Sequence, residues 1–186
     1  NRGTLYKSFV EVVKKTKPKI FIAENVEGLL TMKSKPIKII IKDFNDLGYI
    51  VDYQLVNCKD YGIPQSRKRV IIMGIIKERD NDTKLTTDWN LLKRNKITCT
   101  ISKYFKHLQE PDESDDICQQ LYSKAKKLSK GQGQKEIDLQ SFSPTIRAEH
   151  HGNIEFRRHT KSIINHKEAH LPERRLTLRE AALLQT

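Results

Sequence analysis

Glu24 and Asn25 are the first residues along the chain whose type and position suggest a functional site. They directly follow a continuous apolar run at residues 20–23, which is the pattern of a strand buried on both faces of a parallel sheet. Ligands of open α/β sheets bind beyond the carboxyl ends of the strands, so a carboxylate there is a candidate for binding or proton transfer. A capping or loop carboxylate is the alternative, because strand ends are commonly polar.

A group of hydrogen-bond donors precedes a second apolar run. Gln65, Arg67 and Arg69 alternate along the chain up to the start of residues 70–76. If the alternation of a strand includes them, their three side chains share one face and Lys68 lies on the other. The sequence therefore predicts that three donors converge, and a solvated basic edge is the alternative interpretation.

Metal and dinucleotide sites are not indicated by the sequence. His166 and His170 have the i, i+4 spacing of a helical zinc site, but the glutamate between them is one position away from that motif and a third ligand is not evident. The cysteines never occur as C-x-x-C, and Gly131 and Gly133 lack the flanking strand and helix of a dinucleotide loop. We therefore expect no metal site. The cysteine thiols should be buried among apolar side chains, and the segment around Gly131 and Gly133 should be a simple loop.

Helices and strands that alternate along the chain must position the candidate residues. Apolar spacing predicts helices at residues 5–16 and 37–47, and short apolar runs predict strands at 20–23, 49–56 and 70–76. This order is typical of an α/β fold.

A second region is predicted after residue 78, where polar segments interrupt this regular order. Residues 117–128 have the apolar spacing of a helix. Thr177 and Glu180 have the spacing of a capping box, which marks the start of another helix. No stop signal follows, so we expect that helix to continue to the end of the chain and Thr186 to be an internal boundary rather than a natural terminus.

Composition excludes several classes of protein. The chain has 186 residues, of which 37% are hydrophobic and 31% charged, and this mixture fits neither a disordered tail nor a membrane bundle. Its apolar runs are far shorter than the roughly 18 residues of a spanning helix, and we find no leader pattern. An odd cysteine count favours a reducing cytoplasm, and the net charge of +12 suggests a polyanionic partner.

Several ordered motifs resemble those of DNA (cytosine-5)-methyltransferases. The matching segments are Arg2-Gly3-Thr4-Leu5, Glu24-Asn25-Val26, Leu47-Gly48-Tyr49, Tyr61-Gly62-Ile63-Pro64-Gln65-x-Arg67-x-Arg69, and Arg175-Leu176-Thr177-x-Arg179-Glu180-Ala181 with Leu184-Gln185. The resemblance implies the C-terminal half of a Rossmann-like methyltransferase sheet, followed by a smaller, irregular target recognition domain.

The resemblance also implies a division of the chain. Residues 1–78 resemble part of the catalytic methyltransferase domain, and residues 171–186 resemble the start of a helix that returns to the small or catalytic domain. Residues 79–170 match the family only in lying where its variable target recognition region lies. We therefore expect that region to set the DNA sequence that is recognised.

The chemistry implied by the resemblance is methyl transfer from S-adenosylmethionine to C5 of a cytosine flipped out of duplex DNA. In this family a cysteine thiolate adds to C6 while a glutamic acid holds N3 and the exocyclic amine. Glu24 matches that glutamate, and partial burial at a strand end would raise its pKa and help it keep a proton. Arg69 would contact the O2 side of the base, and Arg67 and Gln65 would order the site and the neighbouring backbone.

Further residues are assigned to the cofactor and to DNA. Leu5 matches a position that lines the cofactor pocket, and Asn25 matches one that shapes the active-site loop. The amides of residues 131–134 could pair with adenine edges, although a plain loop is the alternative, and Arg157 and Arg158 could contact phosphate or guanine. The DNA-binding residues that we expect are Gln65, Gln132, Gln134 and Arg147.

The departures from the family pattern concern the nucleophile and the cofactor loop. The family nucleophile occurs in a Pro-Cys dipeptide, but Cys58, Cys99 and Cys118 follow Asn, Thr and Ile, and the glycine-rich cofactor loop is absent. We therefore expect a fragment of a bacterial restriction-modification or orphan methyltransferase that is inactive alone.

We expect such an enzyme to act on double-stranded DNA in the bacterial cytoplasm, near the nucleoid. It would act together with the missing N-terminal part and, functionally, with a cognate restriction endonuclease. The alternatives are a subunit of a split enzyme, a non-catalytic DNA-binding relative, and a transfer-RNA methyltransferase of the same fold. The length of residues 79–170 argues against the last of these.

Overall fold

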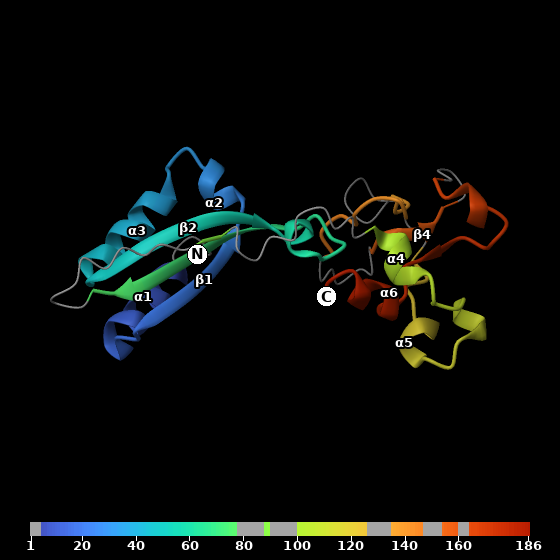
Figure 1. Cartoon of the computed structure of the whole chain (residues 1–186), viewed down its shortest axis with the longest axis horizontal. Helices are drawn as coiled ribbons and strands as arrows, with labels where there is room; N and C mark the ends of the chain where they lie inside the picture. Colours follow the sequence, from blue (N-terminus) through green and yellow to red (C-terminus); the bar gives the residue numbers. More distant parts are fainter. Residues whose placement is uncertain (1–4, 78–87, 90–99, 126–134, 147–153, 160–163) are drawn as a thin grey trace. The chain divides into compact units, whose positions relative to one another are not determined.

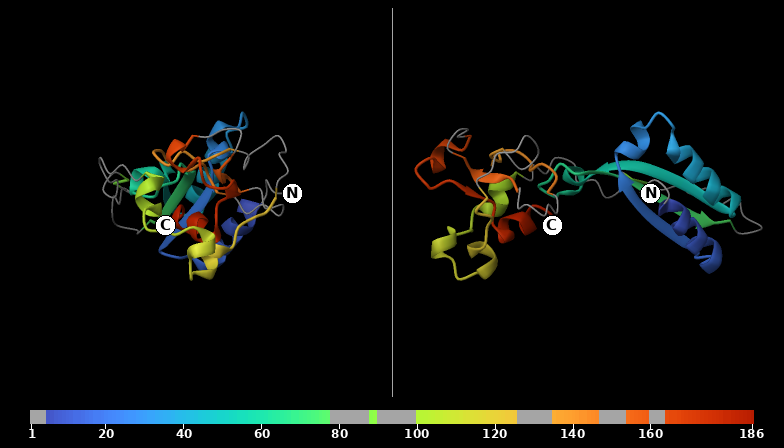
Figure 2. Two further views of the ribbon diagram at one scale, coloured as in Figure 1. Left: turned by 90° about the vertical axis from the view of Figure 1, so that its right-hand side faces the viewer. Right: turned by 180° about the vertical axis from the view of Figure 1, so that it is seen from behind.

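The chain forms two compact units in the computed structural model (Figures 1 and 2). The first unit comprises residues 1–57 and 68–93, and the second comprises 58–67 and 94–186. The loop 58–67 thus belongs to the second unit, although the segments on both sides of it belong to the first. The residues whose structure is described are 5–77, 88–89, 100–125, 135–146, 154–159 and 164–186.

The first unit is built on a sheet of β1 (Ile20–Val26), β2 (Tyr49–Asn57) and β3 (Lys68–Ile76). Their order is β1-β3-β2, and β3 is antiparallel to both neighbours. β1 and β2 therefore run in the same direction, joined through α2 (Gly28–Thr31) and α3 (Pro36–Asp46). The α/β class is confirmed. The strand at 20–23 was expected in a parallel sheet, but its described neighbour β3 is antiparallel, because β3 returns from β2 and inserts beside β1.

Aromatic packing attaches the helices to one face of this sheet. Phe9 of α1 (Leu5–Thr16) lies 5.8 Å, between ring centroids, from both Phe21 of β1 and Phe44 of α3. Phe21 and Phe44 are 4.3 Å apart, and both are buried. The amphipathic spacing that predicted both helices thus places their apolar sides against the same side of β1.

Gly74 provides a test of this packing. It pairs with Phe21 across the β1–β3 ladder, and a Cβ added to it would lie 2.1 Å from Cε1 of the ring. Because neighbouring rings fix Phe21, we expect Gly74→Ala to lower the free energy of unfolding by about 1–3 kcal/mol, the usual cost of overpacking. Urea denaturation followed by Trp89 fluorescence measures the change. Gly28→Ala is the control, since the nearest atom there is 3.9 Å away, and equal losses in the two variants would contradict the prediction.

The opposite face of β1, which also carries Glu24, exposes three apolar side chains in the described part of the chain. Ile20, Ile22 and Val26 are 56%, 62% and 53% exposed, respectively. β1 is also an edge strand of the described sheet. The expectation of a strand covered on both faces is therefore wrong for the chain as described, because all three helices of this unit contribute to the core on the Phe21 side.

Short elements make up the second unit. Its core includes Ile101, Phe105, Ile137, Leu139, Leu176 and Leu184. The elements are η2 (Cys58–Tyr61), α4 (Ile101–Phe105), η3 (Pro111–Glu113), α5 (Ile117–Gln120), β4 (Phe156–Arg158), η4 (His166–Glu168), β5 (Arg174–Arg175) and α6 (Leu178–Leu183).

Two helix predictions for this unit are corrected by the structure. The helix predicted at 117–128 ends at Gln120, because the Leu121 carbonyl accepts from the Leu178 amide and Tyr122 forms a bridge with Thr177. The Thr177–Glu180 capping box is confirmed. The helix that it starts ends at Leu183, short of the end of the chain.

Two further findings concern the described residues as a whole. None of their helices has the length and apolar content needed to cross a bilayer. No group of three or more His, Cys, Asp or Glu side chains in these ranges is arranged to hold a metal ion.

Candidate active-site and recognition residues

An ion pair joins two of the predicted catalytic residues at the carboxyl end of β1. Arg69 Nε lies 2.5 Å from Glu24 Oε1. Glu24 pairs with Ile71 across the ladder and Arg69 with Val26, so the two side chains are diagonal neighbours on one sheet face. A carboxylate acceptor and a guanidinium donor therefore stand side by side.

The environment of Glu24 differs from the expectation. β1 extends to Val26, so Glu24 and Asn25 lie inside the strand rather than after it. The Glu24 side chain is 53% exposed, against 20% for Arg69, and the burial expected to keep a proton on Glu24 is not found among the described residues. A second ion pair, Lys68–Glu27 at 3.0 Å, lies at the same end of the sheet.

The predicted cofactor residues lie on two different elements of the first unit, Leu5 on α1 and Asn25 on β1. Asn25 Oδ1 accepts a hydrogen bond from the Val26 amide at 2.8 Å. Leu5 is the first residue of α1 and is 69% exposed. These contacts do not by themselves form a site for S-adenosylmethionine, so no step below is derived through the cofactor.

Gln65 lies in the second unit and is 1% exposed. Its Nε2 donates to the Leu184 carbonyl at 3.1 Å. Because β3 begins only at Lys68, the alternation that predicted one shared face does not reach Gln65 and Arg67. Arg69 pairs with Glu24, whereas Gln65 is occupied within the second unit, so the described contacts do not bring these donors to one site.

The loop that holds Gln65 pairs with a distant segment. Gln65 forms a parallel bridge with Ser143, the Ser66 amide donates to the Ser143 carbonyl at 2.8 Å, and the Ser143 amide donates to the Pro64 carbonyl at 2.9 Å. Thr145 Oγ1 adds a bond to the Ser66 carbonyl at 3.1 Å. We call this set of contacts the loop ladder.

Six buried or half-buried charges of the second unit form a closed circuit, which we call the arginine–glutamate ring. Each arginine contacts two glutamates and each glutamate contacts two arginines, so the positive and negative charges balance. The contacts are Arg157–Glu168 (2.6 Å), Glu168–Arg158 (3.4 Å), Arg158–Glu110 (2.6 Å), Glu110–Arg174 (3.1 Å), Arg174–Glu180 (2.8 Å) and Glu180–Arg157 (3.3 Å).

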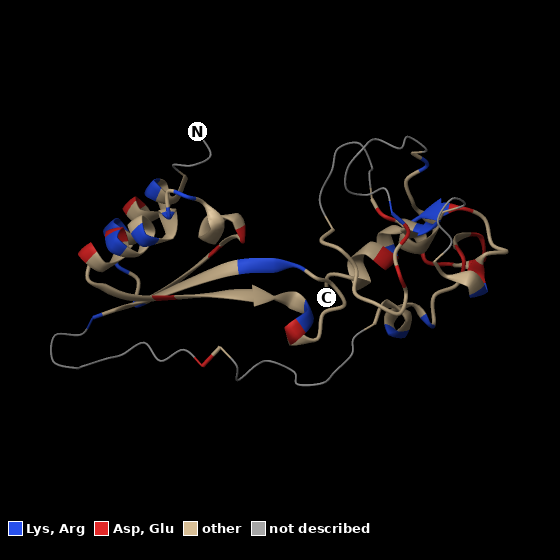
Figure 3. Ribbon diagram, turned by 90° about the horizontal axis from the view of Figure 1, so that it is seen from above, with Lys and Arg blue, Asp and Glu red and all other residues tan. Residues whose placement is uncertain are grey.

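This ring corrects the role expected for Arg157 and Arg158. Both residues are buried, at 6% and 5% exposure, and their guanidinium groups are held by glutamates rather than presented to phosphate or guanine. Figure 3 shows basic and acidic segments intermixed in this unit. Part of the positive charge of the sequence is therefore neutralised inside the protein.

Glu110 makes the ring sensitive to acid. Burial alone would raise its pKa, but the hydrogen bonds and charges of Arg158 and Arg174 outweigh burial and lower the pKa from 4.5 to about 2. The folded carboxyl thus binds a proton less readily than the unfolded one. Its contribution to stability is fully present above pH 4.5 and is lost as the pH falls toward 2.

We therefore expect Glu110→Gln to destabilise the second unit most above pH 5, with the difference from wild type shrinking as the pH falls toward 2. Urea denaturation at a series of pH values measures this difference. Glu113→Gln, an exposed change in η3, the short helix that directly follows Glu110, should show no such trend. A difference for Glu110→Gln that stays constant from pH 7 to pH 3 would contradict the expectation.

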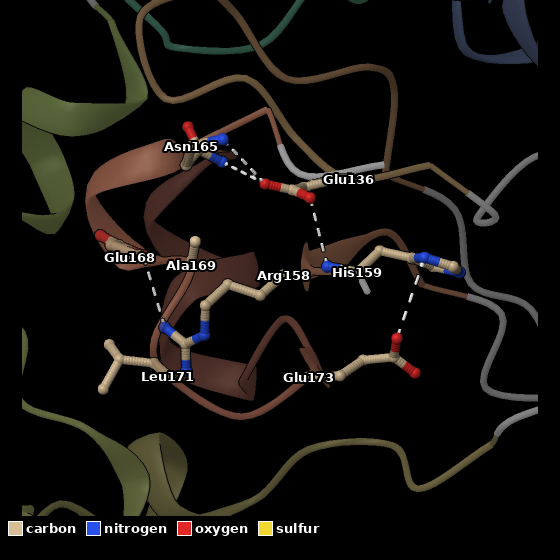
Figure 4. Close-up of a pocket in the computed structure, with 8 residues that line it drawn as sticks. All are labelled: Glu136, Arg158, His159, Asn165, Glu168, Ala169, Leu171 and Glu173. Atoms are coloured by element: carbon tan, nitrogen blue, oxygen red, sulfur yellow. Dashed lines mark hydrogen bonds and ion pairs between the residues drawn. The ribbon is translucent and has the colours of Figure 1, made fainter. Parts of the chain in front are cut away.

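A cavity of about 80 Å³ lies beside the ring. Figure 4 shows the residues that line it, which include Glu136, Arg158, His159 and Glu173. The Glu136 carboxylate on its wall accepts from the backbone amides of His159, Ile164 and Asn165 and from Asn165 Nδ2. His159 Nδ1 lies 3.8 Å from Glu173 Oε2. Because Glu136 is 5% exposed and holds four donors, we assign this carboxylate to structure.

The remaining predicted residues are only partly described. Arg67 is half-buried in the loop, where its carbonyl accepts from the Cys58 amide at 2.9 Å. Gln132, Gln134 and Arg147 lie outside the described residues. Sequence reasoning missed the glutamates that complete the ring. Only Glu180 carried a local signal, through its capping box, since the spacing of Glu110 and Glu168 gives none.

Comparisons with known proteins agree with these motifs. The chain matches the C-5 cytosine-specific DNA methylase family over residues 1–186. It is 52% identical over 75 residues to Type II methyltransferase M.NgoFVII of Neisseria gonorrhoeae, covering 40% of this chain and 20% of that protein. Type II methyltransferase M.BsuRI of Bacillus subtilis is 44% identical over 79 residues, covering 42% of this chain and 18% of that protein.

A solved structure agrees on the fold. The crystal structure of S. pombe Dnmt2 methyltransferase is similar with a TM-score of 0.55 and 14% identity, covering 96% of this chain and 58% of that one. At that identity the likeness shows the fold alone, that of a Rossmann-like methyltransferase. The matched part of the chain spans about a fifth of the length of the two curated relatives. Because the family match extends over all 186 residues, the chain belongs to the family of C-5 cytosine-specific DNA methylases.

Proposed function

We propose that this chain is part of an enzyme that transfers a methyl group from S-adenosylmethionine to C5 of a flipped cytosine in a specific DNA sequence. The observation that carries the proposal, beside the family, is the Glu24–Arg69 pair. An enzyme of this kind would act on chromosomal DNA in the bacterial cytoplasm. We further propose that a restriction endonuclease reading the same sequence accompanies it.

The pair suits the polar edge of cytosine. The carboxyl of Glu24 can hydrogen-bond N3 and the exocyclic amine, while the planar guanidinium of Arg69 can donate to O2. Cytosine C5 is a poor nucleophile, so a group that withdraws electron density at N3 assists addition of a thiolate at C6. Arg67 and the cofactor residues Leu5 and Asn25 keep their predicted roles within this proposal.

The open face of β1 supports a second part of the proposal, which concerns the partner of this chain. Ile20, Ile22 and Val26 form an exposed apolar surface on an edge strand, and such edges are normally covered in native proteins. Because the 75 residues that match M.NgoFVII are 40% of this chain but only 20% of that relative, the relative is about twice as long. We propose that the remainder of a methyltransferase domain covers this face, on the same chain or as a separate subunit.

Reconstitution tests both parts of the proposal. The chain alone should incorporate no tritium from labelled S-adenosylmethionine into DNA, and mixing it with the N-terminal part of a relative such as M.NgoFVII should restore incorporation. Ile22→Lys should prevent association, whereas Ile39→Lys, 50% exposed on α3, should not. Methylation of DNA by the chain alone would overturn the proposal that a partner is needed. Methylation of transfer RNA in place of DNA would overturn the proposal that DNA is the substrate.

Residues 79–170 are proposed to set the DNA sequence that is methylated. The test exchanges them, in the intact enzyme, for the equivalent segment of a relative with a different target. Methylation should move to the donor's sequence while Glu24, Arg67 and Arg69 keep their roles. An active chimera that still marked the original sequence would place recognition elsewhere.

A further inference from the structure

Gln65 is joined to the arginine–glutamate ring by a continuous path inside the second unit. Its Nε2 donates to the carbonyl of Leu184, and the Leu184 amide donates to the carbonyl of Glu180 at 3.1 Å, one helical turn earlier. The Glu180 side chain closes the ring between Arg157 and Arg174. All five residues are buried, so each contact is made away from water.

The same path ends at the loop ladder. Gln65 pairs with Ser143 through its backbone while its side chain binds α6, so the position of α6 determines where residues 64–66 lie against 143–145. Tyr104 Oη adds a bond to the Gly62 carbonyl at 2.8 Å, which holds the other end of the loop to α4. The loop is thus fixed at one end by its own Gln65 side chain, which binds the C-cap carbonyl of α6, and at the other end by the Tyr104 side chain of α4.

We propose that Gln65 is a positioning residue, and that the arginine–glutamate ring, acting through α6, sets the alignment of the loop ladder. At 1% exposure Gln65 has no surface to offer to DNA, so we assign its contribution to the placement of the 143–145 segment rather than to a base or phosphate contact. A buried hydrogen bond to a carbonyl that is itself held by a salt-bridged helix transmits a shift of that helix directly.

Hydrogen exchange of the 186-residue chain tests the path without any assumption about catalysis. Gln65→Leu should speed exchange of the Ser66 and Ser143 amides about tenfold, as expected for one lost buried hydrogen bond. Glu110→Gln, a milder change on the exposed side of the ring, should also speed them. Arg179→Ala is the matched control, because it removes an exposed ion pair with Asp116 from the same helix.

A double-mutant cycle separates the proposed path from general loosening. If the ring acts through Gln65, Glu110→Gln should accelerate the Ser66 amide less in the Gln65→Leu background than in wild type. Additive effects, or an equal effect of Arg179→Ala, would overturn the proposal. Exchange in β1 and β3 of the first unit reports whether a variant simply unfolds the chain.

A final measurement, the methylation kinetics of the intact enzyme, is the one test that rests on the proposed function. In the intact enzyme, Gln65→Leu should raise KM for DNA severalfold with kcat and the salt dependence of binding unchanged, since Gln65 contacts no phosphate. A reduced salt dependence would instead identify a direct DNA contact and overturn the positioning role. Should the enzyme prove not to methylate DNA, the exchange experiments still decide whether Gln65 positions the loop.

Discussion

Replacing Arg174 with methionine is expected to lower the free energy of unfolding of the second unit by about 3–5 kcal/mol, the usual cost of breaking a buried ion pair from one side. Arg174 is 5% exposed and donates to both carboxylate oxygens of Glu180, at 2.8 and 2.9 Å, as well as to Glu110. Without it, Arg157, at 3.3 Å, is the one cationic partner of the Glu180 carboxylate that remains among the residues the structure describes.

The measurement must report on the correct unit. Trp89 donates to Asp52 in the first unit, so its fluorescence is not the suitable probe. Hydrogen exchange of the Thr177 and Glu180 amides, both bonded within the capping box, reports on the second unit. Arg179→Met, an exposed change in α6, should have little effect. A loss below about 1 kcal/mol for Arg174→Met would show that the ring contributes little to stability.

Glu24→Gln in the intact enzyme is expected to lower kcat by about 10²-fold or more, the usual scale for losing a positioned acid. The amide keeps the size of the side chain and can still hydrogen-bond, but it cannot hold or share a proton at N3. The affinity for DNA should change little, because one half-exposed carboxylate contributes no favourable contact to phosphates.

Steady-state methylation kinetics with duplex DNA measure this effect. Glu27→Gln is the matched control, since Glu27 is also ion-paired at the carboxyl end of β1, with Lys68, but matches no motif glutamate. Near-normal turnover of Glu24→Gln would remove Glu24 from the catalytic site. Equal losses in both variants would indicate a general electrostatic effect instead.

Local periodicity was sufficient to predict the first unit's elements but not their pairing. The helices at 5–16 and 37–47 were predictable because each has a single apolar side that packs on the aromatic core. The antiparallel insertion of β3 was not, because an apolar run such as 70–76 carries no information about its neighbours. The strand at 20–23 likewise looked covered on both faces, although the described chain covers only one.

Long-range pairing explains the errors in the second unit. The helix predicted at 117–128 stops because Leu121 pairs with Leu178, a partner that no local pattern identifies. Arg157 and Arg158 resembled a phosphate-binding pair because no local pattern identifies their glutamate partners: Arg158 pairs with Glu110, 48 residues away in the sequence, and Arg157 pairs with Glu168 and Glu180. The pairing of Glu24 with Arg69 was accessible only through the family resemblance, which placed both at one site.

The inclusion of loop 58–67 in the second unit has a consequence for folding during synthesis. Gln65 leaves the ribosome 119 residues before Leu184, the residue whose carbonyl it binds. The β2–β3 hairpin can therefore form early, but the contacts of its tip are complete only after Leu184 has been synthesised. Such non-local closure is slow and leaves intermediates exposed, so the second unit should be the last to fold and the first to need chaperones.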